Sequence, residues 1–198
     1  VANDPAGDFY VQDLVKAGVD TNLHRERDAG TSGRCIVMIT PDAERTMHTF
    51  LGISEKVSEL ELHPEAIEAS QYVYLEGYLV TSPSARAAAI KARQIAERKG
   101  VKTALTFSDP NMVKFFRDGL QDMAGDGVDL LFCNHQEALF WAETDSIEEA
   151  AERLKRTAKT FAITLGSEGA LLFDGQNLIK VPATPVKAVD TNGAGDMF

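Results

Sequence analysis

Short apolar runs alternate with longer amphipathic segments along most of the chain after residue 54. Strands are predicted at residues 72–76, 101–107, 128–133 and 161–165. Helices are predicted between them: one from Ser82 and Pro83 to Gly100, one that opens at Asp109 or Pro110, and helical segments that continue to about Thr157. This order is typical of an α/β fold with a mostly parallel sheet flanked by helices. Since ligands of such sheets bind at the carboxyl ends of the strands, we expect functional residues there.

The two ends of this pattern differ from its middle. Residues 170–174 and 178–181 form a predicted hairpin around Asp174-Gly175, and residues 4–17 form a predicted helix after Asn3 or Asp4. Between residues 23 and 50, two extended runs at 34–40 and 45–50 flank a turn at 41–44. So small a sheet has little core of its own, and a lid over a site and a plain surface hairpin remain open alternatives.

The composition restricts the classes of partner. With 44% hydrophobic residues among 198, the chain can bury a full core, and its formal net charge of −10 disfavours nucleic-acid binding. No apolar run reaches the roughly 18 residues that a membrane span needs. Cys35 and Cys133 occur in apolar, strand-like runs without metal-ligand spacing, so both are expected to be reduced core residues. A cytoplasmic protein is therefore expected.

The final nine residues carry a pattern suited to binding an anion. Asp-Thr-Asn-Gly-Ala-Gly-Asp-Met-Phe, residues 190–198, predicts a strand end, a glycine-rich turn and the first turn of a helix. The backbone N–H groups of Gly193, Ala194 and Gly195 can approach a phosphate closely. Asp196 would repel that phosphate unless it had chemistry to perform, such as accepting the proton of an attacking hydroxyl. The alternative is an ordinary turn capped by an aspartate.

The same nine residues resemble the second signature of the PfkB carbohydrate kinases, the family of ribokinase and adenosine kinase. The resemblance implies a ribokinase-like fold in which Asp196 is the catalytic base, in contact with the substrate, and Gly193, Ala194 and Gly195 form the anion hole. It also implies that Asp190 and Asn192 hold a monovalent cation such as K⁺. Residues 4–7, Asp-Pro-Ala-Gly, resemble the end of the family's GxDxxG motif.

Glu76 ends the first predicted strand of the sheet, within Leu75-Glu76-Gly77. In ribose and nucleoside kinases of the resembled family, a similarly placed glutamate contacts the sugar hydroxyls, which makes Glu76 a substrate-binding candidate. The alternative is a half-buried glutamate paired with a helix N-terminus. Asp109 and Asn111 follow the next strand. Some members of the resembled family carry an aspartate or asparagine near the substrate here, but helix capping explains both residues adequately.

Asn134 and Glu137 follow the third strand, three residues apart, so both face the same way if a helix begins there. Their N-x-x-E pattern resembles the family motif in which the glutamate orders Mg²⁺ through water and the asparagine reaches the phosphates. A single carboxylate suits Mg²⁺, which keeps several of its waters. The alternative is an asparagine helix cap.

The fourth strand ends in Thr-Leu-Gly-Ser-Glu-Gly, residues 164–169. This segment resembles the family's T-x-G-x-x-G motif, which implies that Thr164, Gly166 and Gly169 lie at the ATP phosphates. A dinucleotide fingerprint would run into a helix, whereas a hairpin follows here, so a Rossmann oxidoreductase is disfavoured.

Together these residues predict a kinase core at 1–22 and 51–198, incomplete at both ends, and a β-strand lid at 23–50 that also offers a homodimer contact. The expected activity is ATP- and Mg²⁺-dependent phosphorylation of a hydroxymethyl group. The segments LEGYLV, FSDPN and DTNGAGD favour an adenosine-like nucleoside over a sugar as the acceptor. A non-catalytic nucleotide-binding module and a structural fragment are the alternatives, and Asp196 argues against a module that only binds.

Overall fold

The structure, a computed structural model, describes residues 1–21, 29–41 and 45–198. The predicted turn at 41–44 and the first part of the predicted lid lie mostly outside the described residues. The chain divides into two compact units, residues 1–57 with 187–198, and residues 58–186. The predicted division at residues 22/23 and 50/51 stays a prediction.

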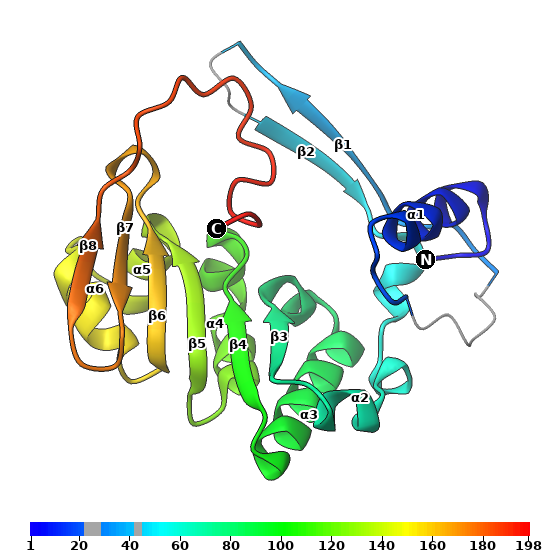
Figure 1. Cartoon of the computed structure of the whole chain (residues 1–198), viewed down its shortest axis with the longest axis horizontal. Coiled ribbons are helices and arrows are strands. Elements are labelled where there is room, and N and C mark those ends of the chain that lie inside the picture. Colours follow the sequence, from blue (N-terminus) through cyan, green and yellow to red (C-terminus); the bar gives the residue numbers. More distant parts are fainter. Residues whose placement is uncertain (22–28, 42–44) are drawn as a thin grey trace. The chain divides into compact units, whose positions relative to one another are not determined.

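The larger unit is built on a six-stranded sheet (Figure 1). Its strands, in sheet order, are β3 (Tyr72–Glu76), β4 (Lys102–Thr106), β5 (Val128–Asn134), β6 (Ala158–Thr164), β7 (Ala170–Phe173) and β8 (Leu178–Val181). The first four strands are parallel, and β7 and β8 are added antiparallel. The mostly parallel sheet predicted from the alternation is therefore confirmed, although β6 begins at residue 158 instead of 161.

Helices connect the strands of this unit, and the four that follow β3 begin at side-chain caps. They are α2 (Pro64–Glu68), α3 (Pro83–Lys99), α4 (Pro110–Ala124), α5 (His135–Ala142) and α6 (Ile147–Leu154), with 3-10 turns η2 (Glu59–Glu61), η3 (Gly77–Thr81) and η4 (Gly166–Glu168). The side chains of Ser82, Asp109, Asn134 and Ser146 accept backbone N–H groups from the first turns of α3, α4, α5 and α6. No helix in the described part of the chain is long and apolar enough to span a membrane.

The core of the larger unit lies between the central strands and the helices. Leu105, Leu131 and Ile163 of β4, β5 and β6 are fully buried, as is Leu120 of α4. The indole N–H of Trp141 in α5 donates to the Thr157 hydroxyl at 3.1 Å, which satisfies the one polar group of this buried side chain. This packing fixes the strands, and with them the positions of the residues at their ends.

The smaller unit contains α1 (Pro5–Lys16), η1 (Gly52–Lys56) and a two-stranded antiparallel sheet of β1 (Arg34–Ile39) and β2 (Arg45–Phe50). Asp4 caps α1 through Gly7 and also accepts the backbone N–H and the hydroxyl of buried Ser32 at 2.9 and 2.7 Å. These hydrogen bonds, led by the Ser32 backbone, lower the pKa of Asp4 to about 2. The ionised Asp4 carboxylate therefore ties the start of α1 to the segment before β1.

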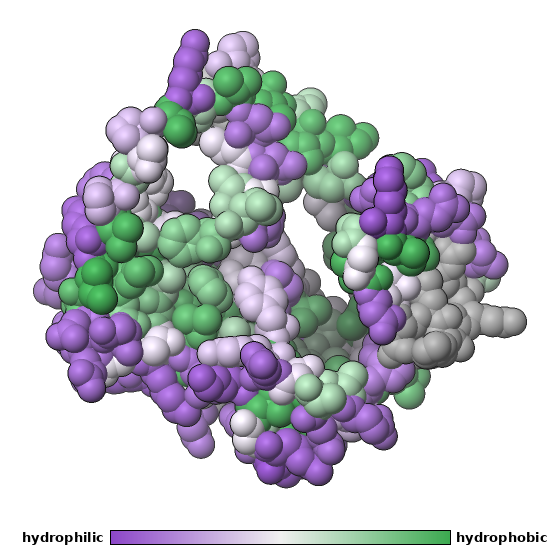
Figure 2. Space-filling model, in the orientation of Figure 1, coloured by the Kyte–Doolittle hydropathy of each residue, from purple (hydrophilic) through white to green (hydrophobic). Residues whose placement is uncertain are grey.

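The prediction that both cysteines are core residues is half wrong. Both are free thiols, but only Cys133 of β5 is buried, whereas Cys35 of β1 is exposed. The run of apolar residues around Cys35 predicted that its side chain is buried, but a sheet of two strands leaves most of its side chains in solvent. Apolar residues along β1 and β2 accordingly reach the surface (Figure 2), among them Ile36, Met38 and Phe50.

Candidate functional site

Three predicted site residues each end a strand at the carboxyl edge of the parallel sheet. Glu76 ends β3, Asn134 ends β5 and Thr164 ends β6. The strand register pairs Glu76 with Thr106, the last residue of β4, and pairs Asn134 with Thr164. Because paired strands lie about 4.8 Å apart, Asn134 and Thr164 are direct neighbours. The larger unit therefore presents these side chains along one edge, where ligands of such sheets bind.

Asn134 and Glu137 form a reciprocal pair at the start of α5. The Asn134 side-chain oxygen accepts the Glu137 backbone N–H at 2.9 Å, and Glu137 Oε2 accepts the Asn134 backbone N–H at 2.8 Å. Glu137 Oε1 also accepts from Asn134 Nδ2 at 2.9 Å. This is a capping box, so the alternative of an asparagine helix cap is present in the structure. The same box also holds a carboxylate at the carboxyl edge.

Glu137 as a whole residue is only 3% exposed, which is unusual for a glutamate. Burial raises its pKa to about 7, the Asn134 N–H bond opposes that rise, and the nearby charge of Asp109 adds to it. A divalent cation above this edge would offset the cost of burying the charge, and one carboxylate acting through water suits Mg²⁺. Within the described residues there is no cluster of three acidic, histidine or cysteine side chains able to bind a metal alone.

Replacing Glu137 with glutamine is expected to flatten the dependence of stability on pH. In the unfolded chain this carboxyl group loses its proton above its ordinary pKa of 4.5, whereas in the folded protein Glu137 keeps the proton up to a pH of about 7. The free energy of unfolding should therefore fall as pH rises through this window, by about 3 kcal/mol from this group, and then level off. Urea unfolding at a series of pH values without Mg²⁺ measures the slope.

The control is Glu152→Gln, at an exposed carboxylate of α6. This variant should keep the slope of the unaltered protein, whereas Glu137→Gln should lose most of it. A slope that is equally steep in Glu137→Gln would assign the pH dependence to other groups.

The two glycines in the segment after β6 have different structural surroundings. Gly166 has a φ of 59°, and a Cβ added there would meet nothing within 4 Å. Gly169 has a φ of 97°, and a Cβ there would overlap the backbone carbonyl of Val181 in β8. Gly169 therefore closes the hairpin onto β8, while the Gly166 backbone is open to a ligand.

Glu76 is exposed and makes no capping bond to the turn that follows it, contrary to the alternative of a glutamate paired with a helix N-terminus. Its Oε2 accepts instead from the Ser108 hydroxyl at 3.0 Å. Ser108 was not among the predicted site residues, although a polar residue directly after the predicted strand at 101–107 was a signal that could have found it. Asp109, the next residue, caps α4 by accepting the Asn111 backbone N–H at 2.7 Å, so the capping interpretation is confirmed for Asp109.

The C-terminal segment belongs to the smaller unit and forms turns. No strand ends at Asp190, and no helix is assigned between residues 190 and 198, so both of those predictions are wrong. The Met197 N–H bonds to the Gly193 carbonyl at 3.1 Å, which is one hydrogen bond of helical spacing. A strand would need a neighbour to pair with, and one such bond does not make a helix.

Two of the three predicted anion-hole amides are open. In the described part of the chain, the N–H groups of Gly193 and Gly195 make no hydrogen bond, whereas that of Ala194 donates to the Thr191 carbonyl at 3.2 Å. Gly193 has a φ of 74°, and Asp196 Oδ2 lies 3.8 Å from where its Cβ would be. The exposed Asp196 carboxylate therefore lies close to Gly193.

Asp190 and Asn192 form a compact turn beside these amides. The Asp190 side chain accepts the Asn192 N–H at 2.7 Å. This bond is the ordinary stabilising contact of an aspartate turn, and it keeps one carboxylate oxygen engaged.

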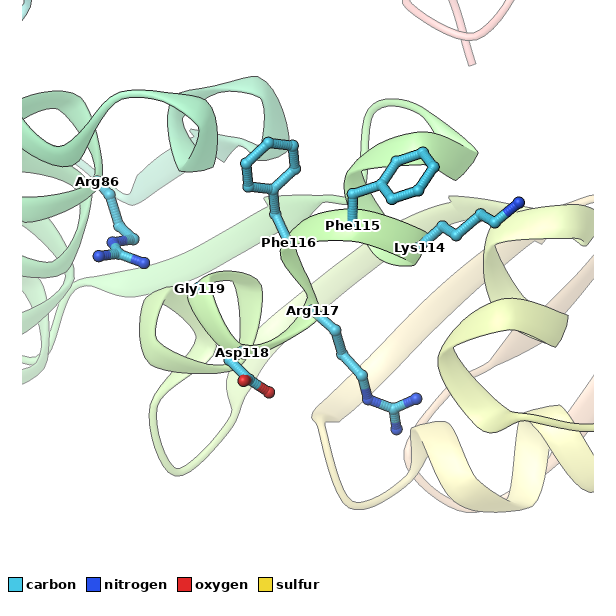
Figure 3. A pocket seen from close by; sticks show the side chains of 7 residues that line it. All are labelled: Arg86, Lys114, Phe115, Phe116, Arg117, Asp118 and Gly119. Atoms are coloured by element: carbon cyan, nitrogen blue, oxygen red, sulfur yellow. The ribbon is translucent and has the colours of Figure 1, made fainter.

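A pocket of about 340 Å³ in the larger unit contains none of the predicted site residues. It is lined by Arg86 of α3 and residues 114–119 of α4, where α4 kinks at Phe116. Figure 3 shows Arg86, Lys114 and Arg117 pointing in different directions. Arg117 is already paired with Glu143 at 2.7 Å. The cationic side chains of the pocket do not converge on a common point, so the carboxyl edge of the sheet remains the candidate site.

Comparison with known proteins gives the family of this chain. A family model described as pfkB family carbohydrate kinase matches residues 1–198. The chain belongs to the PfkB family. The predicted ribokinase-like fold is also confirmed, because the crystal structure of a Sinorhizobium meliloti adenosine kinase matches the whole chain with a TM-score of 0.92 and 34% identity.

Two further PfkB-like proteins extend the comparison. Adenosine kinase of Saccharomyces cerevisiae is 30% identical over 215 residues, which cover 100% of this chain and 61% of the relative. A putative ribokinase II of E. coli, solved with ATP and Mg²⁺, shares the fold with a TM-score of 0.87 at 22% identity, over 99% of this chain and 64% of that one. The S. meliloti match covers 61% of its structure, so this PfkB chain spans about three fifths of the length of such kinases.

Proposed function

We propose that the chain is the part of a PfkB kinase that brings ATP to an acceptor hydroxymethyl group, with an adenosine-like nucleoside preferred over a sugar. The observation that carries the proposal is the line of side chains at the carboxyl edge of the sheet. There the Asn134–Glu137 pair and Thr164 stand directly beside each other. The adenosine kinases similar to this chain favour the nucleoside.

In this proposal Asn134, Thr164 and the open Gly166 backbone bind the ATP phosphates, and Gly169 keeps their loop in shape. Glu137 holds Mg²⁺ through water. Its burial supports this role, because a cation compensates a buried carboxylate. Mg²⁺ when bound would neutralise charge on the phosphates. The E. coli structure with ATP and Mg²⁺ lends further support to this pair of ligands.

The acceptor is held by Glu76 and activated by Asp196. Glu76 accepts hydroxyl hydrogens from the nucleoside or sugar, and Asp196 accepts the proton of the attacking hydroxyl. The amides of residues 193–195 stabilise negative charge on the transferred phosphoryl group, with those of Gly193 and Gly195 contributing most because they are open.

Three further expectations belong to the same proposal. Asp190 and the Asn192 backbone hold a monovalent cation such as K⁺, which would be tested as K⁺ dependence of the rate.

The β1–β2 lid forms a homodimer contact, supported by its exposed apolar residues and tested by light scattering. A reducing cytoplasmic location fits the two free thiols.

The test is ATP-dependent phosphorylation by the full-length protein of adenosine, inosine, ribose, fructose and 2-keto-3-deoxygluconate. The expected result is turnover that requires Mg²⁺ and is highest with adenosine. ATP binding without turnover of any acceptor would favour the nucleotide-binding module, and no ATP binding at all would favour the structural fragment.

A further inference from the structure

Ser108 has a backbone conformation that serine rarely adopts. Its φ is 68°, and it is one of two non-glycine residues with positive φ in the described part of the chain. The Asp109 N–H bonds to the Phe107 carbonyl at 2.8 Å, which closes a tight turn around Ser108. An L-residue pays roughly 1–2 kcal/mol for such a φ, and glycine avoids that cost. The serine side chain is therefore worth explaining.

The Ser108 hydroxyl bridges two groups at the end of β3. Its Oγ accepts the Gly77 backbone N–H at 2.8 Å and lies 3.0 Å from Glu76 Oε2. The lone hydroxyl hydrogen points to the Glu76 carboxylate, which has no hydrogen to give when ionised. The Ser108 N–H is itself anchored on the Thr106 hydroxyl at 3.2 Å. Both the place and the direction of the hydroxyl are thus fixed.

The bridge depends on close contact between the ends of β3 and β4. A Cβ added to Gly77 would lie 2.5 Å from the Phe107 carbonyl oxygen, so the two backbones touch where a side chain would separate them. Phe107 is fully buried against Trp141, with ring centroids 4.7 Å apart. Ser108 is therefore held directly beside a buried residue of the core.

We propose that Ser108 is the positioning residue that aims the Glu76 carboxylate at the acceptor. This inference rests on the proposed function, in which Glu76 binds acceptor hydroxyls. Glu76 Oε2 is committed to Ser108, while Oε1 makes no hydrogen bond among residues 1–21, 29–41 and 45–198. One oxygen is anchored and the other is open, which suits an acceptor that donates a ring hydroxyl, as ribose does. Without the anchor, an exposed glutamate samples several rotamers and loses side-chain conformational entropy when it binds the acceptor.

Two variants of the full-length protein separate this role from a purely structural one. Ser108→Gly removes the hydroxyl but adopts a φ of 68° without strain, and Ser108→Ala removes the hydroxyl and keeps the strain. Both should raise the KM and the calorimetric Kd for adenosine about tenfold, the usual effect of losing a hydrogen bond to a charged group. The KM for ATP and kcat should stay within about threefold. The Tm of Ser108→Gly should change little, because the strain that glycine relieves offsets the loss of the acceptor for the Gly77 N–H.

The link to Glu76 is tested by a double-mutant cycle. Adding Ser108→Gly to Glu76→Ala should weaken adenosine binding no further, since the Ser108 hydroxyl then has no carboxylate to position. Full adenosine affinity in Ser108→Gly, or effects that add in the double variant, would overturn the positioning role and leave the proposed function intact. If the unaltered protein bound and phosphorylated no acceptor, the proposed function itself would fail, and this inference with it.

Discussion

Asp196→Asn is expected to lower kcat by about a thousandfold or more, within the range that a positioned general base contributes. Asparagine keeps the size of the side chain but does not accept the proton of the attacking hydroxyl. The affinity for ATP should be retained or slightly increased, because a negative charge near the open amides of Gly193 and Gly195 is removed. Steady-state kinetics with adenosine, together with calorimetric titration of ATP, measure both effects.

The matched control is Asp122→Asn, at an exposed position of α4 away from every proposed site residue. It should leave kcat and ATP affinity unchanged. A kcat for Asp196→Asn equal to that of the unaltered protein would remove the assignment of the base, even if the protein proved to be a kinase.

Gly169→Ala is expected to cause the largest loss of stability among single methyl additions in the loop after β6. The new methyl group would overlap the Val181 carbonyl, and the φ of 97° is strained for any residue with a Cβ. Because the obstacle is backbone and not a flexible side chain, β8 must shift. The free energy of unfolding should fall by about 3–5 kcal/mol, as measured by urea unfolding.

Gly166→Ala, three residues earlier in the same loop, is the control for that variant. It has a φ of 59° and no neighbour within 4 Å, so only the conformational cost of about 1–2 kcal/mol should be seen. In the full-length protein it should nevertheless weaken ATP binding, because the added methyl lies where a phosphate would approach. Equal losses of stability in the two variants would contradict the assignment of Gly169 to the hairpin and Gly166 to the ligand.

Most of the fold followed from local signals in the sequence. Ser82 and Gly100 mark the two ends of α3, as a capping serine and a left-handed glycine do, and β3 spans the predicted residues 72–76. The start of β6 was predicted three residues late. Lys159 is the second residue of this strand, and its ammonium group pairs with Asp129 at 2.7 Å. Asp129 lies 30 residues earlier in the chain, so the sequence around residue 159 does not reveal this partner.

The candidate site was predictable where it depends on topology. Glu76, Asn134 and Thr164 were found because strand ends in a parallel sheet share an edge. Ser108 was missed because its role depends on a left-handed φ and on Gly77, which lies 31 residues earlier in the chain. The exposure of Cys35 was missed for a similar reason, since the number of layers around a strand is a tertiary property.

The most direct test of the kinase assignment is a crystal structure of the full-length protein with Mg²⁺, a non-hydrolysable ATP analogue and adenosine. We expect the γ-phosphate to lie against the Gly193 and Gly195 amides, the Asp196 carboxylate to lie within hydrogen-bonding distance, about 3 Å, of the acceptor hydroxymethyl oxygen, and Mg²⁺ to be bound through water to Glu137. A nucleotide bound away from Asn134 and Thr164, or an Asp196 carboxylate directed away from the acceptor, would contradict it.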